Sequence, residues 1–235
     1  MTDKKTDFRS KKDSGRTKRD KSVRVKTSKG RKDSSTRWLE RQLNDPYVKE
    51  AQRLGMRSRA GFKIMEIDEK LNLFKKGVKV VDLGAAPGGW AQYAASKGAS
   101  EVIAVDLLPI DELPGVTSIE MDFTEDDAEE ILFKALGNDK ADIVMSDMAP
   151  NTVGHKQTDH LRIMMLVELA YDFAVKVLKP GGVFVSKVRQ GGAQGELLTM
   201  MRKDFSTIKH MKPPSSRKGS PEQFVIAIGY RGGSK

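Results

Sequence analysis

A glycine-rich turn and an acidic residue that follows it form the first candidate ligand site. Residues 84–89 are Gly-Ala-Ala-Pro-Gly-Gly, and such a turn lets the backbone approach a ligand closely. Asp106 follows Gly84 by 22 residues, near the spacing of about 20 at which an acid binds a ribose in dinucleotide-binding units. The turn lacks the G-x-G-x-x-G pattern and the lysine of a phosphate-binding loop. It therefore suits an adenosine ligand without phosphate, such as S-adenosylmethionine. A purely structural turn is the alternative.

Two charged residues near strand ends form the second candidate site. Lys187 interrupts an apolar run at 183–188, where a lysine is unfavourable unless it reaches a carboxylate or the ligand-binding edge of the sheet. Asp147 directly follows a predicted strand at 141–146, so it would lie at a carboxyl end, where open α/β sheets bind ligands. The alternative for Lys187 is an ammonium group that simply reaches solvent.

Hydrophobic patterns predict the elements that would position these residues. β-Branched residues at 78–83 predict a buried strand before the turn, and residues 90–96 continue as a helix. Further strands are predicted at 102–105, 116–121, 141–146, 183–188, 205–211 and 223–229, helices at 126–136, 160–178 and 195–203, and a loop at 154–158. Of these strands, 205–211 is expected at a sheet edge, and 223–229, the last one, is expected to be inserted antiparallel. Together these elements predict a nucleotide-binding α/β sheet.

The positive charge is concentrated near the N-terminus. Residues 1–36 hold 14 Lys and Arg against 5 Asp, a net charge of +9, whereas the whole chain carries +10. This segment is almost free of apolar residues, so we expect a disordered basic tail at 1–36 and one folded domain at 37–235. The tail could contact nucleic acid phosphates or only aid solubility. A transit peptide fits less well, because the segment contains aspartates and no amphipathic apolar face.

Composition excludes several classes of site. The chain has no Cys and 3 His, so we expect neither a disulfide nor a metal centre, and a reducing cytoplasm is favoured. No apolar stretch approaches the roughly 20 residues that span a bilayer, so we expect no membrane association. Lys63 is predicted to lie early on an amphipathic helix. The alternative is that Lys63 is an ordinary surface lysine without a functional role.

Several motifs in order now resemble a known family. They are DLGAAPGGW, DLLP, SDMAP, the lysine in VSKV, and SSR followed by S-x-E before the last strand. From about Trp38 to Tyr230 the chain resembles the FtsJ-type ribosomal RNA 2′-O-methyltransferases of the large subunit methyltransferase E family. The resemblance implies a Rossmann-like, mostly parallel seven-stranded sheet with helices on both faces. It also implies S-adenosylmethionine as methyl donor and, as acceptor, the ribose 2′-oxygen of a uridine in large-subunit (23S-type) ribosomal RNA. The assembled or nearly assembled large ribosomal subunit would be the partner.

The resemblance also implies the roles of particular residues. Two departures from the family pattern are Gly61, where many relatives carry a bulkier residue, and Ile64, which replaces a usual Leu. Gly61 could alter the RNA end of the site. The implied catalytic set is Lys63, Asp147, Lys187 and Glu222, and the implied methyl-donor contacts are Gly88, Trp90, Asp106, Asp122 and Asp147, with no metal.

The chemistry requires a stronger oxygen nucleophile and in-line alignment with the methyl group. Lys187 could act as a cation that stabilises developing oxyanion charge, or, if neutral, as a general base. Asp122 is expected to meet the adenine edge, with Leu107 and Phe123 walling the ring. RNA phosphates would be held by basic residues at Arg37, Arg53, Arg57, Arg59, Lys156 and Arg217.

Two other classes of function remain open. A methyltransferase that acts on protein or on a base is one, although carbon methylation of a base usually needs the cysteine that this chain lacks. A non-catalytic ribosome assembly factor is the other, although it would not need two lysines facing Asp147. We expect a cytoplasmic monomer.

Overall fold

One twisted sheet organises the chain. The computed structural model describes residues 23–25, 33–150, 154–189 and 195–233, and in that part seven strands follow the order β3-β2-β1-β4-β5-β7-β6. The strands are β1 (Lys79–Leu83), β2 (Glu101–Asp106), β3 (Val116–Glu120), β4 (Ala141–Ser146), β5 (Leu178–Arg189), β6 (Phe205–Met211) and β7 (Glu222–Tyr230). The helices are α1 (Asp33–Leu43), α2 (Pro46–Arg53), α3 (Gly61–Leu71), α4 (Gly89–Ser96), α5 (Ala128–Ala135), α6 (Lys156–Val177) and α7 (Gly195–Asp204).

The sheet is parallel except at one strand. Strands β1 to β5 pair in parallel, whereas β7 lies antiparallel between β5 and β6. The predicted edge position of the 205–211 strand and the antiparallel insertion of the last strand are therefore confirmed. From β1, the strands β2 and β3 extend the sheet to one side, whereas β4 and β5 extend it to the other. The carboxyl ends of β1 and β4 therefore form the switch point at which such sheets bind ligands.

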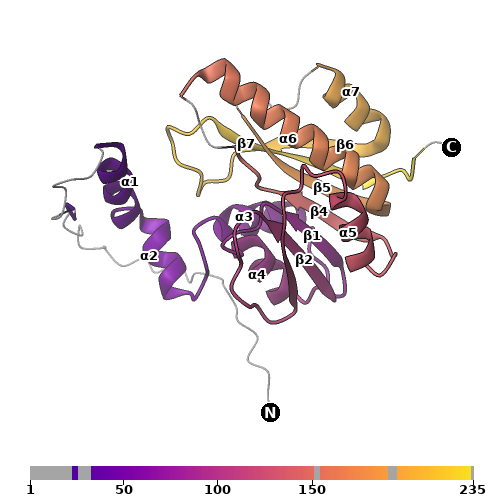
Figure 1. Cartoon of the computed structure of the whole chain (residues 1–235), viewed down its shortest axis with the longest axis horizontal. Coiled ribbons are helices and arrows are strands. Elements are labelled where there is room, and N and C mark those ends of the chain that lie inside the picture. The colour runs from indigo at the N-terminus through magenta and orange to yellow at the C-terminus, as the bar shows by residue number, and fades with distance from the viewer. Residues whose placement is uncertain (1–22, 26–32, 151–153, 190–194, 234–235) are drawn as a thin grey trace, which may run out of the picture.

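Helices cover both faces of the sheet, and each face has its own hydrophobic core (Figure 1). Side chains alternate along each strand, so Val80 packs with α3 and α4 while Val81 packs with α5, α6 and α7. The predicted α/β fold with a seven-stranded, mostly parallel sheet is confirmed. None of the helices in the described ranges is long and apolar enough to span a bilayer.

The first described helix begins within the segment expected as a tail, and one loop differs from expectation. Helix α1 begins at Asp33, four residues before the expected start of the folded domain, and Asn44 hydrogen-bonds the backbone of Val23. Apart from 23–25 and 33–36, the predicted tail lies outside the described residues. The loop expected at 154–158 is wrong from Lys156 onward, because the His155 side chain caps α6 by accepting from the backbone of Thr158.

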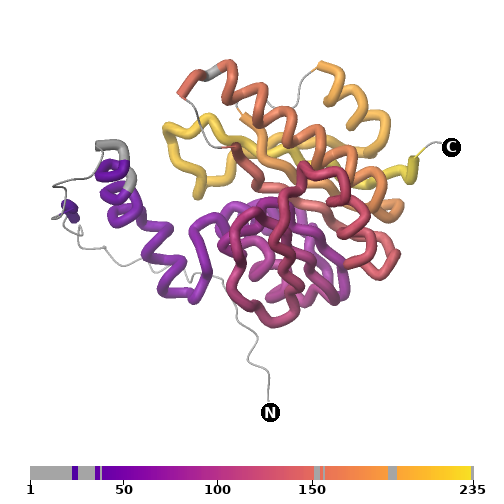
Figure 2. The backbone as a smooth tube through the Cα atoms, in the orientation of Figure 1, coloured from indigo at the N-terminus to yellow at the C-terminus, as the bar shows by residue number. Residues whose placement is uncertain are grey.

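The loop between β6 and β7 lies on the side of the sheet toward the N-terminal helices, as the yellow segment in Figure 2 shows. Arg59 donates a hydrogen bond to the backbone carbonyl of Ser215 in this loop. Arg217, from the same loop, forms an ion pair of 3.3 Å with Asp45 at the start of α2. Segments at opposite ends of the chain are thus joined beside the carboxyl edge of the sheet.

Gly84 allows the chain after β1 to lie against the chain after β4. Its φ is +75°, and a Cβ atom there would lie 2.8 Å from both the Cα and the backbone nitrogen of Met148. The neighbouring Asp147 backbone N–H donates to the Leu83 carbonyl at 3.1 Å. Glycine is therefore required at this position by both conformation and space.

We expect Gly84→Ala to destabilise the protein more than Gly77→Ala, measured as the free energy of unfolding in urea. Gly77 has a φ of +86°, and a Cβ atom added there would meet no atom of the described residues within 4 Å, so alanine costs only the backbone strain of about 1–2 kcal/mol. In Gly84→Ala the new methyl group also clashes with backbone atoms of Met148, which should lower the free energy of unfolding by a further ~1–3 kcal/mol. Equal losses in the two variants would contradict the close approach.

Candidate active site

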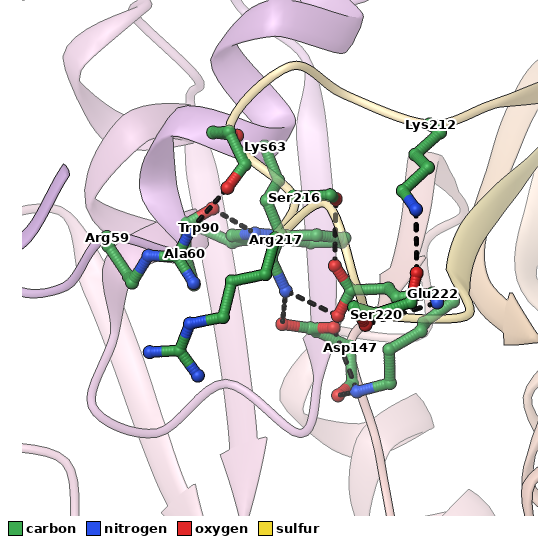
Figure 3. Close-up of polar contacts among 12 residues, drawn as sticks. Arg59, Ala60, Lys63, Trp90, Asp147, Lys212, Ser216, Arg217, Ser220 and Glu222 are labelled. Atoms are coloured by element: carbon green, nitrogen blue, oxygen red, sulfur yellow. Dashed lines mark hydrogen bonds and ion pairs between the residues drawn. The ribbon is translucent and has the colours of Figure 1, made fainter. Parts of the chain in front are cut away.

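Four charged side chains from distant parts of the chain meet at the carboxyl edge of the sheet, and Figure 3 labels Lys63, Asp147 and Glu222 among them. Asp147 follows β4, and Ser146 pairs with Ser186 of β5, so Asp147 and Lys187 lie at the same level of adjacent strands. Asp147 and Lys187 each come two positions after a core residue, Met145 and Val185, so both lie on the face of the sheet that α3 covers. Lys63, from the first turn of α3, reaches the same point.

Glu222 joins this group only because β7 runs antiparallel. In the pairing of β5 with β7, Lys187 lies opposite Phe224 and Arg189 opposite Glu222. The start of β7 therefore meets the end of β5, and Glu222 arrives at the edge where the parallel strands end. The four residues that the family resemblance implied as catalytic are thus brought together.

The contacts form a chain of alternating charges. Lys187 Nζ lies 2.9 Å from Asp147 Oδ1 and also donates to the Asp147 backbone carbonyl. Lys63 Nζ lies 3.6 Å from Asp147 Oδ2 and 2.8 Å from Glu222 Oε2. The two cations and two carboxylates balance, so no charge in this group is buried without a partner.

The charges shift each other's protonation. Burial alone would raise the pKa of Asp147, but Lys187 and Lys63 lower it below the ordinary value. Burial alone would lower the pKa of Lys63, but the negative charges of Asp147 and Glu222 raise it above its ordinary value. At neutral pH Asp147 is therefore a carboxylate and Lys63 an ammonium, which excludes Lys63 as a proton acceptor there.

Two aromatic side chains pack next to the Lys63 ammonium group. Its Nζ lies 5.6 Å from the centroid of the Phe224 ring, and the Trp90 ring lies 5.6 Å from the same ring. Trp90 is 2% exposed, and its indole N–H donates to the Ala60 carbonyl at 2.8 Å, as Figure 3 shows. The Trp90 side chain is thus part of the core, and only its backbone follows the glycine-rich turn.

The two departures from the family pattern also lie in the core. A Cβ atom at Gly61 would lie 2.5 Å from the Met56 methyl carbon and 3.2 Å from the Gly89 carbonyl. Ile64 is fully buried. Gly61 therefore permits α3 to pack closely against the start of α4, and its effect on the RNA end of the site stays a prediction.

The second part of the site lies at the ends of β1 and β2. Asp106 accepts hydrogen bonds from the backbone N–H groups of Ala86 (2.8 Å) and Leu108 (2.9 Å). Its carboxylate is thereby fixed against the glycine-rich turn, in which Gly88 has a φ of +100°. This pairing of an acid with a turn free of bulky side chains fits an adenosine-containing ligand.

Residues expected around an adenine ring are partly accessible. Leu107 is 64% exposed, whereas Phe123 packs edge-on against Phe173 of α6 with ring centroids 5.5 Å apart. Asp122 follows β3, and hydrogen bonds from the Thr124 side chain and backbone lower its pKa. Asp122 is therefore ionised and able to accept hydrogen bonds, while its contact with adenine stays a prediction.

Asp82 is a buried acid that sequence reasoning did not single out. It is 0% exposed on β1, and among the residues that the structure describes neither of its carboxylate oxygens has a hydrogen-bond partner. Burial, followed by the negative charge of Asp147, raises its pKa well above the ordinary value. The backbone N–H of Ala91 offsets part of this increase without satisfying hydrogen-bond geometry. The sequence signal for this residue is an acid within an apolar run, two residues before the glycine-rich turn.

Several arginines expected to bind RNA are engaged within the protein. Arg59 lies 3.1 Å from the buried Asp45, and Arg57 donates to the Glu112 carbonyl at 2.6 Å. Arg53 is mostly exposed and pairs with Glu50 at 2.6 Å. Arg37 is exposed on α1, and the Lys156 side chain lies outside the described residues. The expected phosphate contacts are therefore better supported for Arg37 and Arg53 than for Arg57 and Arg59.

Comparison with known proteins agrees with this geometry. A family model described as FtsJ-like methyltransferase matches residues 56–230. Proteins named Ribosomal RNA large subunit methyltransferase E, from Sphingopyxis alaskensis and Novosphingobium aromaticivorans, are each 58% identical to this chain, over 89% of this chain and 91% and 94% of their own lengths. A solved structure from Plasmodium falciparum, described as a ribosomal RNA methyltransferase, has a TM-score of 0.67 at 27% identity, over 75% of this chain and 100% of that chain.

The sheet order and the two-part site define a Rossmann-like methyltransferase. The family match extends from just before α3 to the last residue of β7 and includes all four charged residues of the site. The chain belongs to the FtsJ-like methyltransferase family.

We expect Asp82→Asn to become relatively more stable than the unaltered protein as pH rises from about 4. Because the pKa of Asp82 is raised by folding, the folded chain retains a proton that the unfolded chain loses above pH ~4, which weakens folding by up to about 1.4 kcal/mol per pH unit. Asparagine has the shape of the protonated acid and does not titrate. Urea unfolding between about pH 4.5 and 7.5 measures the difference.

Asp139→Asn is the matched control for this titration. Asp139 lies at the surface, and a hydrogen bond from Lys79 lowers its pKa, so its charge stabilises the fold above the ordinary pKa and its replacement should be relatively less stable there. A loss of stability in Asp82→Asn that also grows with pH would contradict a protonated Asp82.

Proposed function

We propose that this methyltransferase moves a methyl group from S-adenosylmethionine to the ribose 2′-oxygen of a uridine in large-subunit (23S-type) ribosomal RNA. The observation that carries the proposal is the meeting of Lys63, Asp147 and Lys187 with Glu222 at the sheet edge, beside the turn that Asp106 contacts. Relatives named Ribosomal RNA large subunit methyltransferase E support the choice of acceptor.

The donor would be held by the residues at the ends of β1, β2 and β3. S-Adenosylmethionine, when bound, supplies an electrophilic methyl group on its sulfonium. Asp106 would accept hydrogen bonds from the ribose of the donor, Asp122 would meet the adenine edge, and Gly88 with the Trp90 backbone would line the turn. Asp147, which belongs to both halves of the site, would lie nearest to the reacting groups.

Lys187 would act as an ammonium group that stabilises the negative charge developing on the 2′-oxygen as the hydroxyl proton passes to water. Its Nζ faces the Asp147 carboxylate at 2.9 Å. Asp147 would orient Lys187, and Lys63 with Glu222 would complete the polar surroundings of the acceptor. Positive charge held beside a developing oxyanion is among the largest contributions that a protein makes to such a reaction.

The RNA partner would be bound through phosphate contacts outside this charge cluster. Exposed arginines on the N-terminal helices, such as Arg37 and Arg53, are suitable. We further propose that residues 37–235 form the methyltransferase domain, that the basic tail adds phosphate contacts, and that the enzyme acts on the large subunit in the cytoplasm. All four charged residues come from one chain, which suits action as a monomer.

The first test uses tritiated S-adenosylmethionine with large ribosomal subunits that lack the modification, beside free ribosomal RNA and a protein control. Digestion of the product to nucleosides locates the label. Label in 2′-O-methyluridine is the expected result, with more from subunits than from free RNA. Label on a base or on protein would overturn the acceptor that we propose.

We expect Lys187→Met to reduce kcat by at least about 10²-fold, because the ammonium group that stabilises the 2′-oxygen is removed. Lys176→Met is the matched control, since Lys176 pairs with Glu129 at 2.7 Å on the surface and should leave kcat unchanged. Near-normal turnover of a folded Lys187→Met variant would contradict the role.

The pH dependence of kcat separates the two roles that Lys187 could have. If Lys187 acts as a cation, kcat should be constant through neutral pH and fall only at the pH at which the lysine loses its proton. A general base predicts a rate that rises with pH toward the pKa of the lysine, and that result would exclude the cationic role.

A further inference from the structure

Ser216, in the loop between β6 and β7, contacts a residue of the charge cluster directly. Its hydroxyl donates to Glu222 Oε1 at 2.9 Å, while Glu222 Oε2 accepts from Lys63 Nζ at 2.8 Å (Figure 3). Both oxygens of this carboxylate therefore have a fixed partner. Ser216 is 6% exposed, so water cannot easily replace its hydroxyl.

The orientation of Glu222 affects the rest of the cluster. Lys63 lies closer to Glu222 (2.8 Å) than to Asp147 (3.6 Å). If Glu222 rotated away, Lys63 would move toward Asp147 and compete with Lys187 for that carboxylate. The position of Glu222 thus decides how the two cations share Asp147.

The backbone that carries Ser216 is held from the opposite side. Ser215 donates to Glu66 Oε2 of α3 through both its backbone N–H (2.9 Å) and its hydroxyl (2.7 Å). The Ser215 carbonyl accepts from Arg59, and Arg59 pairs with the buried Asp45. This part of the loop is therefore fixed to α2 and α3, the elements on the acceptor side of the site.

We propose that Ser216 is a positioning residue for methyl transfer, which fixes the Glu222 carboxylate and thereby holds Lys63 apart from Lys187. The inference rests on the proposed function, since it assigns how one part of that site is kept in order. In this role Ser216 would act through Glu222, to which it donates, and not by direct contact with the methyl donor or the reacting oxygen.

The adjacent serines provide a matched pair of variants. Ser216→Ala should lower kcat about tenfold, as expected for a lost hydrogen bond to a charged group, and leave the KM for the methyl donor unchanged. Ser215→Ala removes a hydroxyl that is also buried but bonded to Glu66, and its backbone N–H still holds Glu66. It should therefore retain kcat even if its thermal unfolding temperature falls.

Two further variants separate positioning from a purely structural role. Ser216→Thr keeps a hydroxyl and should restore most of kcat. Adding Ser216→Ala to Glu222→Gln should reduce kcat less than the same change does in the unaltered protein, because the hydroxyl acts through the carboxylate. All variants are compared by the label found in 2′-O-methyluridine, with folding checked by thermal unfolding.

The outcomes distinguish this inference from the proposed function. No label in 2′-O-methyluridine from the unaltered protein would overturn the proposed function itself. Label from the unaltered protein, together with a kcat of Ser216→Ala within about twofold of normal, a value smaller than one hydrogen bond to a charged group supplies, would overturn only the role of Ser216. An equal loss in the Glu222→Gln background would do the same.

Discussion

The sharing of one partly buried carboxylate between two lysines is the interaction on which the site depends. Asp147 lies 2.9 Å from Lys187 and 3.6 Å from Lys63, and these cations keep it ionised although burial opposes the charge. Removing one charged member would leave the cluster with an unbalanced, partly buried charge, which is unfavourable. The fold must therefore hold the ends of β4 and β5 and the start of α3 close together in fixed relative positions.

The reversed direction of β7 completes this arrangement. A parallel seventh strand would carry its first residue to the opposite edge of the sheet, and Glu222 would be far from Lys63. Because β7 is inserted antiparallel between β5 and β6, Glu222 supplies the second negative charge. The loop that precedes β7 is brought to the same edge, where it bonds to α2 and α3.

Trp90 links the two halves of the site. Its backbone follows the glycine-rich turn, while its side chain lies under Phe224 and bonds to Ala60, three residues before Lys63. Aromatic packing and a buried hydrogen bond thereby fix the glycine-rich turn relative to the start of α3, which carries Lys63. Methyl transfer requires such a fixed relation, because its rate depends on in-line alignment of the methyl group and the oxygen.

The sequence by itself determined the strands, the glycine-rich turn, the placing of Asp106, Asp147 and Lys187 near strand ends, and the antiparallel last strand. These features follow from local periodicity and from residue types that are unfavourable elsewhere. Lys63 and Glu222, 159 residues apart, could be paired beforehand only through family resemblance. The tertiary structure alone decided that Arg59 is engaged with Asp45, that Ser216 holds Glu222, and that Asp82 is buried with no hydrogen-bond partner in the described part of the chain. Desolvation and long-range contacts have no local signal in the sequence.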